Sequence, residues 1–276
     1  MKDSKLVFIG AGNMARSLIS GLINNGRSPA SITATDINQS QLDKLQDTLA
    51  ISTSVDNAAA IRQADIVVLA IKPQHIRALI DDTREALQER KPMIISIAAG
   101  LRESDLTRWI GAELPVVRCM PNTPSMLGAG VTALYANAKV SGEQRAMAGG
   151  ILATAGITEW VAEEGLLDTV TAISGSGPAY FFLFSECIAA KAAELGLDKD
   201  TAVRFAAHTC FGAARMLIES GDSPEQLRLN VCSKGGTTEA AIASFEASGI
   251  RAMVNDAMDA CYNRSIEMGK ELGEEK

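Results

Sequence analysis

The stretch KLVFIGAGNMA, residues 5–15, decides the fold of this chain. It begins as an apolar run that is typical of a buried β-strand. Gly10, Gly12 and Ala15 then complete the pattern G-x-G-x-x-G/A, directly before a helix-like segment. In that pattern the first glycine permits a tight turn, the second lets the backbone approach a pyrophosphate, and the small third residue lets the helix pack on the strand. The stretch therefore predicts the start of a dinucleotide-binding domain. A glycine turn that binds nothing is the alternative.

Short β-branched runs alternate with helical patterns from this stretch to about residue 162. The runs lie at residues 5–10, 31–36, 65–71, 93–99, 115–120, 130–136 and 157–161. Several are uninterrupted apolar runs, as expected for parallel strands that are covered on both faces. Because strand–helix alternation is typical of a doubly wound sheet, we expect an α/β fold. Residues 1–162 are predicted to form a Rossmann domain with a doubly wound, mostly parallel sheet.

The pattern changes at about residue 163, where strand-like runs give way to alanine, leucine and methionine at helical spacing. Residues 163–276 are therefore predicted to form an all-helical domain. The helix that begins near Pro178 is hydrophobic nearly all round, so it must be covered on all sides. In a domain of about 110 residues we expect a partner subunit to provide that cover, which predicts a symmetric dimer.

Composition argues against several classes of protein. The formal net charge of −7 argues against a general nucleic-acid or membrane-surface binder. Five scattered cysteines without a C-x-x-C pair, and only two histidines, leave no credible metal site. Unpaired thiols fit a reducing compartment, and the N-terminus has no signal-peptide pattern. The most apolar helix carries Glu186 and Lys191, which argues against a membrane span. We therefore expect a cytoplasmic protein.

The choice of coenzyme depends on Asp36, which ends the second predicted strand. A carboxylate at this position commonly accepts hydrogen bonds from an adenosine ribose and would repel the 2′-phosphate of NADP. The residues that follow include no arginine or lysine to offset it, so Asp36 favours NADH. A strand that ends in aspartate only for its turn is the alternative. Two further stretches, 70–74 and 96–100, lie where a bound dinucleotide would pass.

Six motifs now stand together in order along the chain. They are GAGNMA (10–15), AIKP (70–73), SIAAG (96–100), RCMPNTP (118–124), SGSGPAY (174–180) and CSKGGTT (232–238). The sequence closely resembles pyrroline-5-carboxylate reductase over essentially its whole length. The resemblance implies an oxidoreductase that reduces 1-pyrroline-5-carboxylate to L-proline with NADPH or NADH, the last step of proline biosynthesis. It also implies a homodimer through the helical domain, with a larger ring such as a decamer as a further possibility.

The resemblance also implies roles for particular residues. The cofactor would be bound by Gly10, Ala11, Gly12, Asn13, Met14, Ala15, Asn57, Ala70, Ile71, Lys72, Pro73, Ala98 and Ala99, with Asp36 beside them. Of these, Ala98 and Ala99 fall in a strand-end motif near the nicotinamide ribose. The substrate would be bound by Ser233, Gly235, Gly236, Thr237 and Thr238. Thr238 holds the position that hydrogen-bonds the imine nitrogen and is the expected catalytic residue. Two points stay open. Lys234 stands where the family commonly has proline, which leaves open the rigidity and local charge of the substrate loop. The family often prefers NADPH, whereas Asp36 favours NADH, which leaves open the choice of coenzyme.

The segment Ser233–Thr238 also has a physical interpretation of its own. Two glycines let the backbone bend and approach a ligand, and Thr237 and Thr238 are typical N-cap residues. The N–H groups at the start of the following helix could hold the carboxylate of a small anion. A plain connection between two helices with a threonine cap is the alternative.

Two other functions compete with this one. The first is a β-hydroxyacid or imine reductase of similar build, which would use a lysine on the helix between the domains. Lys191 lies about 13 residues from Pro178, or roughly 20 Å along a helix, which is too far from the expected nicotinamide site. The second is a non-catalytic NAD(P) sensor, which would not need the Ser/Gly/Thr loop.

Overall fold

The computed structural model describes residues 4–274. The chain divides into two compact units, one of Met1–Gly175 with Cys261–Lys276 and one of Ser176–Ala260. This division differs from the predicted boundary between residues 162 and 163. The short helix α7 (Leu166–Val170) packs on strands of the sheet and buries Leu167 and Asp168, so it stays with the first unit.

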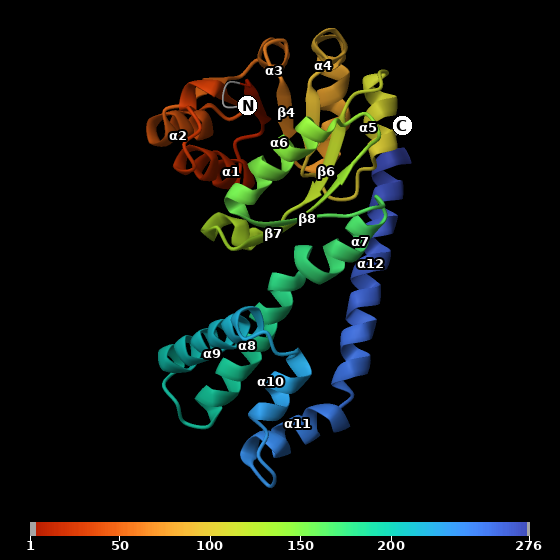
Figure 1. The fold of residues 1–276 in the computed structure, drawn as a ribbon. Helices are drawn as coiled ribbons and strands as arrows, with labels where there is room; N and C mark the ends of the chain where they lie inside the picture. Colours follow the sequence, from red (N-terminus) through yellow and green to blue (C-terminus); the bar gives the residue numbers. More distant parts are fainter. Residues whose placement is uncertain (1–3, 275–276) are drawn as a thin grey trace. The chain divides into compact units, whose positions relative to one another are not determined.

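The first unit is built on one eight-stranded sheet with the order β3-β2-β1-β4-β5-β6-β7-β8. Its strands are β1 (Leu6–Ile9), β2 (Ile32–Thr35), β3 (Ser52–Ser54), β4 (Ile66–Leu69), β5 (Met93–Ser96), β6 (Val116–Met120), β7 (Gly130–Ala136) and β8 (Gly156–Trp160). All neighbours pair in parallel except β6 and β7. The predicted doubly wound, mostly parallel sheet is confirmed (Figure 1).

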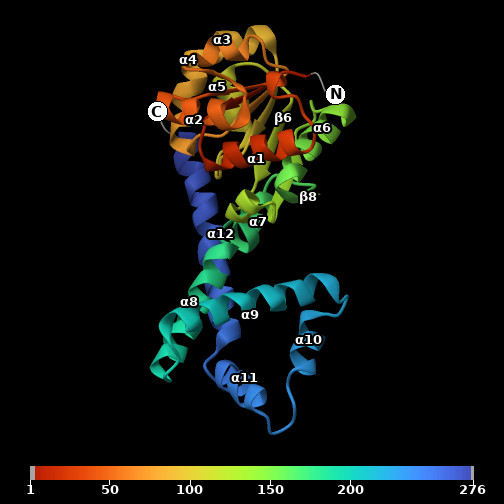
Figure 2. The same ribbon diagram turned by 90° about the vertical axis from the view of Figure 1, so that its left-hand side faces the viewer.

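Helices cover both faces of this sheet. One face carries α1 (Asn13–Asn24), α2 (Gln39–Leu49) and α6 (Gly142–Leu152), and the other carries α3 (Asn57–Ile61), α4 (Ile76–Arg90) and α5 (Glu103–Ile110). Strand β1 shows why: Leu6 and Phe8 belong to the first core, whereas Val7 and Ile9 belong to the second. Successive side chains of a strand point to opposite faces, so an unbroken apolar run requires two covers. Figure 2 shows α1 and α4 on opposite sides of the sheet.

The second unit consists of helices within its described residues. They are α8 (Gly177–Glu194), α9 (Lys199–Glu219), α10 (Pro224–Asn230), α11 (Thr237–Ala247) and the first part of α12 (Ile250–Glu274). Its buried core is small and consists of Ala189, Ala202 and Ala206, against which Ala192 packs. The predicted helical C-terminal region is confirmed.

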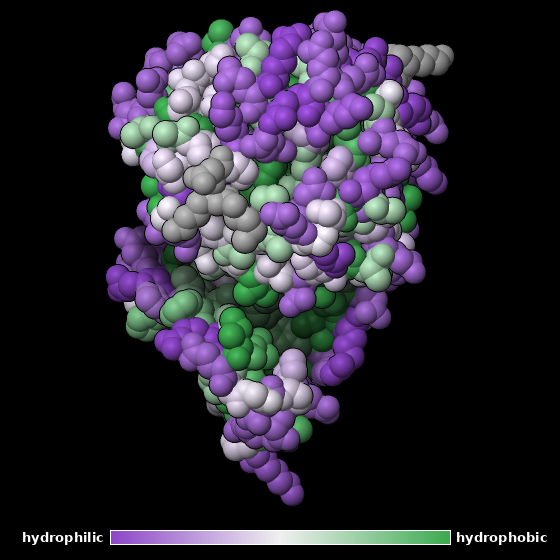
Figure 3. All heavy atoms as spheres, turned by 45° about the horizontal axis from the view of Figure 1, so that its top comes forward, coloured by the Kyte–Doolittle hydropathy of each residue, from purple (hydrophilic) through white to green (hydrophobic). Residues whose placement is uncertain are grey.

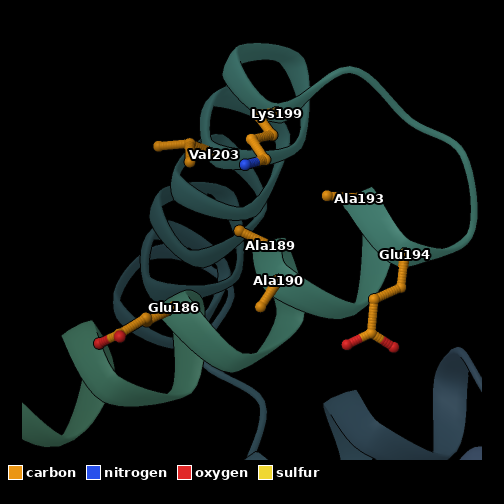
Figure 4. A pocket seen from close by; sticks show the side chains of 7 residues that line it. All are labelled: Glu186, Ala189, Ala190, Ala193, Glu194, Lys199 and Val203. Carbon is orange, nitrogen blue, oxygen red and sulfur yellow. The ribbon is translucent and has the colours of Figure 1, made fainter.

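Large apolar side chains of the second unit are exposed in the single chain. Phe181 and Phe182 of α8 are 62% and 67% exposed, and Phe211 of α9 is 61% exposed. Figure 3 shows hydrophobic residues in green at the molecular surface. A groove of about 550 Å³ opens between α8 and α9, and small side chains such as Ala189 and Ala193 line it (Figure 4). No helix among residues 4–274 is both long and apolar enough to cross a bilayer.

Candidate active site

The predicted cofactor residues of the first unit lie at one edge of the sheet. Ile9 pairs with Thr35 and with Leu69, and Leu69 pairs with Ser96. The carboxyl ends of β1, β2, β4 and β5 therefore reach the same level. Strand order reverses between β1 and β4, and ligands of open α/β sheets bind in the crevice at such a switch point.

Gly10 is fixed by its own neighbourhood. Its φ of +106° is one that L side chains rarely adopt, and an added Cβ would lie 2.5 Å from the carbonyl oxygen of Ala70 and 2.8 Å from Cγ2 of Ile71. Its N–H donates to the carbonyl of Thr35 at 2.7 Å. The turn after β1 therefore packs directly on the turn after β4, and the structure brings Gly10, Ala70 and Ile71 together.

Gly12 is a glycine for a different reason. It is the N-cap residue of α1, has an ordinary φ of −71°, and an added Cβ would meet no atom within 4 Å. The fold itself therefore does not require glycine at this position. Gly12 and Asn13 are exposed, Ala15 is buried against the core, and the first turn of α1 carries no acidic residue. This open helix N-terminus suits an anion such as a pyrophosphate.

Asp36 connects the glycine loop to the end of β2 by a hydrogen bond. Its Oδ2 accepts a hydrogen bond from the N–H of Ala11 at 2.8 Å, and its Oδ1 accepts one from the N–H of Asn38 at 2.9 Å. Asp36 therefore has the turn role that the sequence left open as an alternative. Each carboxylate oxygen can accept a second hydrogen bond, so Asp36 can hold its turn and still accept from a ribose hydroxyl.

The other predicted cofactor residues follow strands at the same edge. Asn57 is the first residue of α3, after β3, and its helix is capped by Asp56. Exposed Lys72 is the N-cap of a short 3-10 helix after β4, and half-buried Pro73 is the first residue of that helix. After β5, Ala98 is 4% exposed and Ala99 is half-buried. The candidate cofactor site thus draws on the ends of five strands.

The predicted substrate loop belongs to the second unit and joins α10 to α11. The N–H of Gly236 donates to the carbonyl of Ser233 at 2.9 Å, which closes a tight turn. Gly235 takes a φ of +73°, and a Cβ on Gly236 would lie 2.4 Å from Oγ of Ser233. Both glycines are therefore required by the turn itself.

The N-cap of α11 corrects one detail of the sequence interpretation. Gly236 is the N-cap residue, and Thr237 and Thr238 are the first two residues of the helix. The reason is that the turn requires extended backbone at Gly236, where φ is −85° and ψ is 169°. Helix geometry leaves the first N–H groups of α11 without intrahelical partners. Thr238, which is half-buried, lies in this first turn.

Glu239 is a member of this loop that sequence reasoning missed. Its Oε2 accepts a hydrogen bond from the N–H of Gly235 at 2.5 Å. The N–H groups of Gly235 and Gly236 are thus both occupied, whereas the first N–H groups of α11 have no partner within the helix and suit a substrate carboxylate. A glutamate three residues after the N-cap is the spacing of a capping box, which could have revealed this contact.

The motifs 118–124 and 174–180 also meet. Buried Asn122 donates from Nδ2 to the carbonyl of Ser174 at 3.1 Å, and its Oδ1 accepts from the N–H of Val131 at 2.9 Å. A Cβ on Gly175 would lie 2.4 Å from Cε of Met120. Residues Thr171–Gly175 form a π-helical turn, and such turns are frequent at functional sites.

Two further observations limit the chemistry of the described residues. Groups of three or more His, Cys, Asp and Glu side chains that could hold a metal ion are absent from residues 4–274. Lys191, the lysine that a β-hydroxyacid enzyme would require, is exposed and forms an ion pair with Glu194 of the same helix at 2.7 Å. Burial raises the pKa of the Cys119 thiol far above its ordinary value, so this cysteine stays protonated.

Comparisons with known proteins cover nearly the whole chain. A family model described as pyrroline-5-carboxylate reductase dimerisation matches residues 164–268, and one described as NADP oxidoreductase, coenzyme F420-dependent, matches residues 5–100. Pyrroline-5-carboxylate reductase of Pseudomonas aeruginosa is 45% identical over 274 residues, which is 99% of this chain and 100% of that protein. The enzyme of Escherichia coli is 34% identical over 269 residues, 97% of this chain and 99% of that protein.

Solved structures agree with these relatives. A pyrroline-5-carboxylate reductase from Coxiella burnetii superposes with a TM-score of 0.91 at 40% identity, covering 96% of this chain and 98% of that chain. The pyrroline carboxylate reductase of Plasmodium falciparum, solved with NADP bound, gives a TM-score of 0.86 at 28% identity and covers 98% and 99%. The resemblance seen in the six motifs is confirmed, and this chain belongs to the pyrroline-5-carboxylate reductase family.

Proposed function

We propose that this chain reduces 1-pyrroline-5-carboxylate to L-proline with NADPH or NADH, the last step of proline biosynthesis. The observation that carries the proposal is the end-to-end likeness to pyrroline-5-carboxylate reductases, at 45% identity over 274 residues. The open N-terminus of α1 at Gly12 supports the coenzyme part of the proposal, because a glycine that the fold does not need leaves room for a pyrophosphate.

The chain's residues bind and orient the reactants in this proposal. Bound NADPH or NADH supplies a hydride to the imine carbon, and the imine nitrogen gains a proton. Gly10, Gly12 and the helix behind them hold the pyrophosphate, while the first turn of α11 offers N–H groups to the substrate carboxylate. The hydroxyl of Thr238 donates a hydrogen bond to the nitrogen. Positioning by both loops supplies most of the rate enhancement.

The proposal includes a homodimer that forms through the second unit. Its support is the exposed apolar surface of α8 and α9 and the match of residues 164–268 to a dimerisation model. A ring of such dimers, such as a decamer, is the larger assembly that light scattering would distinguish. The proposed location is the cytoplasm, because Cys119, Cys187, Cys210 and Cys232 are free thiols and free thiols suit a reducing compartment.

Oxidation of NADPH and of NADH by the purified protein, with and without 1-pyrroline-5-carboxylate, tests the proposal. We expect oxidation of the coenzyme only when the imine is present, with proline as the product. A folded protein that binds coenzyme but does not turn over with the imine would contradict the proposed activity and support the sensor alternative. The ratio of the two rates measures the coenzyme preference.

A further inference from the structure

The loop that follows β5 is held by the last turns of α12. This loop, residues 97–102, carries Ala98 and Ala99, the predicted contacts near the nicotinamide ribose. A Cβ on Gly269 of α12 would lie 2.8 Å from the carbonyl oxygen of Gly100, and one on Gly100 would lie 3.5 Å from the N atom of Gly269. The two backbones therefore lie in close contact: Gly269 has no room for a Cβ, and Gly100 takes a φ of +84° that L side chains rarely adopt.

The same face of α12 also contacts α5. Ser265, Gly269 and Gly273 are spaced by four residues, so they follow one another along one side of the helix. A Cβ on Gly273 would lie 2.9 Å from each carboxylate oxygen of Asp105, and the carbonyl of Gly273 accepts from Arg108 at 2.7 Å. Both Asp105 and Arg108 belong to α5, the helix that follows the loop.

A buried carboxylate completes the attachment. Asp168 of α7 is 4% exposed; its Oδ2 accepts from the guanidinium of Arg102 at 2.6 Å, and its Oδ1 accepts from the hydroxyl of Ser265 at 2.7 Å. Arg102 is both the last residue of the loop and the N-cap of α5. A buried charge persists only where it is paired and hydrogen-bonded, so these three side chains fix one another.

We propose that Asp168 and the face of α12 formed by Ser265, Gly269 and Gly273 position the loop 97–102 for the nicotinamide end of the coenzyme. This inference rests on the proposed function, because it takes Ala98 and Ala99 as coenzyme contacts. Asp168 is a positioning residue that acts through Arg102, and Ser265 acts through Asp168. Gly269 acts through Gly100, and Gly273 acts through Asp105 of α5. A displacement of about 1 Å at such a loop can cost on the order of 10²-fold in rate.

Three variants test the inference by disturbing the attachment of the loop to different degrees. Gly269→Ala places a Cβ against the carbonyl of Gly100, Asp168→Asn removes the charge that pairs with Arg102, and Ser265→Ala removes one hydrogen bond. Two variants serve as matched controls. Gly150→Ala adds a Cβ to α6 where nothing lies within 4 Å. Arg264→Ala removes the exposed ion pairs of the residue next to Ser265.

The first readout is the Kd of NADPH and of NADH, measured by fluorescence titration without imine, followed by the KM of each reactant. We expect Gly269→Ala and Asp168→Asn to raise the coenzyme Kd and KM at least about tenfold, equivalent to about 1.4 kcal/mol. We expect Ser265→Ala to raise them about threefold. The KM of the imine should change less than twofold, and both controls should match the parent protein.

Two results would overturn the inference. One is a coenzyme Kd that is unchanged in Ser265→Ala and also unchanged in Gly269→Ala or Asp168→Asn, provided that circular dichroism shows the variant to be folded. The other is an equal rise in the KM of coenzyme and imine, which would indicate a general structural role. Coenzyme binding is measured without imine, so this test does not depend on activity. A parent protein that binds coenzyme but does not reduce the imine would contradict the proposed function. The coenzyme Kd values of the variants would still decide the inference about the loop 97–102.

Discussion

The glycines of the cofactor loop differ in what they do, and single substitutions separate their roles. Gly10→Ala would force an alanine to φ +106° with its Cβ 2.5 Å from a backbone oxygen, so we expect it to cost at least about 2 kcal/mol of unfolding free energy. Gly12→Ala meets no neighbour, so its unfolding free energy should stay within about 0.5 kcal/mol of the parent. Coenzyme affinity should nevertheless fall at least about tenfold. Urea unfolding and coenzyme titration measure the two effects, and normal coenzyme binding by folded Gly12→Ala would contradict the role assigned to this loop.

The charge of Asp36 sets a second test. Asp36→Asn keeps an oxygen that can accept from the N–H of Ala11 and removes the negative charge that a 2′-phosphate would meet. We expect the ratio of kcat/KM with NADPH to kcat/KM with NADH to rise about tenfold, equivalent to about 1.4 kcal/mol. Asp43→Asn, which changes a carboxylate within α2 that accepts from Gln39, is the control. An unchanged ratio would mean that Asp36 serves its turn alone.

Thr238 carries the proposed hydrogen bond to the imine nitrogen. If its hydroxyl takes part in proton transfer, Thr238→Ala should lower kcat by roughly 10²–10⁴-fold. Thr238→Ser keeps the hydroxyl and should retain most of the rate. The side chain is half-buried in the first turn of α11 and does not cap the helix, so neither change should alter folding. Near-normal turnover of Thr238→Ala in steady-state assays would remove Thr238 from the mechanism.

Among the elements, the turn before α11 depends on one carboxylate. Glu239 holds the N–H of Gly235 and carries negative charge at a helix N-terminus, where charge of that sign is favourable. We expect Glu239→Ala to cost about 1 kcal/mol of unfolding free energy, the usual cost of a lost cap, and to raise the KM of the imine several-fold as the loop loosens. Glu239→Gln keeps an acceptor and should have the smaller effect in both measurements. A KM of Glu239→Ala equal to that of the parent would show that the loop is held without this contact.

Comparison of the predicted and observed strands shows which features of the fold a sequence pattern can predict. Apolar, β-branched runs predict seven strands because burial on both faces leaves a clear pattern, and each run overlaps a strand of the structure. Strand β3 (Ser52–Ser54) was not predicted because three small polar residues at the sheet edge carry no such pattern. The candidate coenzyme residues, apart from Asn57 after β3, follow the predicted strands and could be placed from the ends of those strands. The contact of Gly100 with Gly269 could not be predicted, because it depends on a distance that only the folded backbone defines.

For the whole molecule, the balance of buried and exposed apolar surface argues for assembly. The second unit buries three alanines as its own core, whereas Phe181, Phe182 and Phe184 of α8 are 62%, 67% and 47% exposed. Fully burying such a side chain contributes about 1.5–3 kcal/mol, so a helical unit that leaves its phenylalanines in water forgoes most of its stabilisation. A second copy of the same surface, related by a two-fold axis, would bury them.

If the exposed phenylalanines of α8 form the interface between two copies of the chain, Phe182→Asp should prevent assembly. We expect the charged variant to shift the measured mass in light scattering to that of a 29.1 kDa monomer and to lower the Tm. The Tm of the parent should rise with protein concentration, because assembly stabilises only the folded chain. Ile37→Asp, at a side chain that is 97% exposed in the first unit, should leave the mass unchanged. If Phe182→Asp keeps the mass and Tm of the parent, α8 is not the surface through which the chains associate, and the exposed phenylalanines of this helix need another cover.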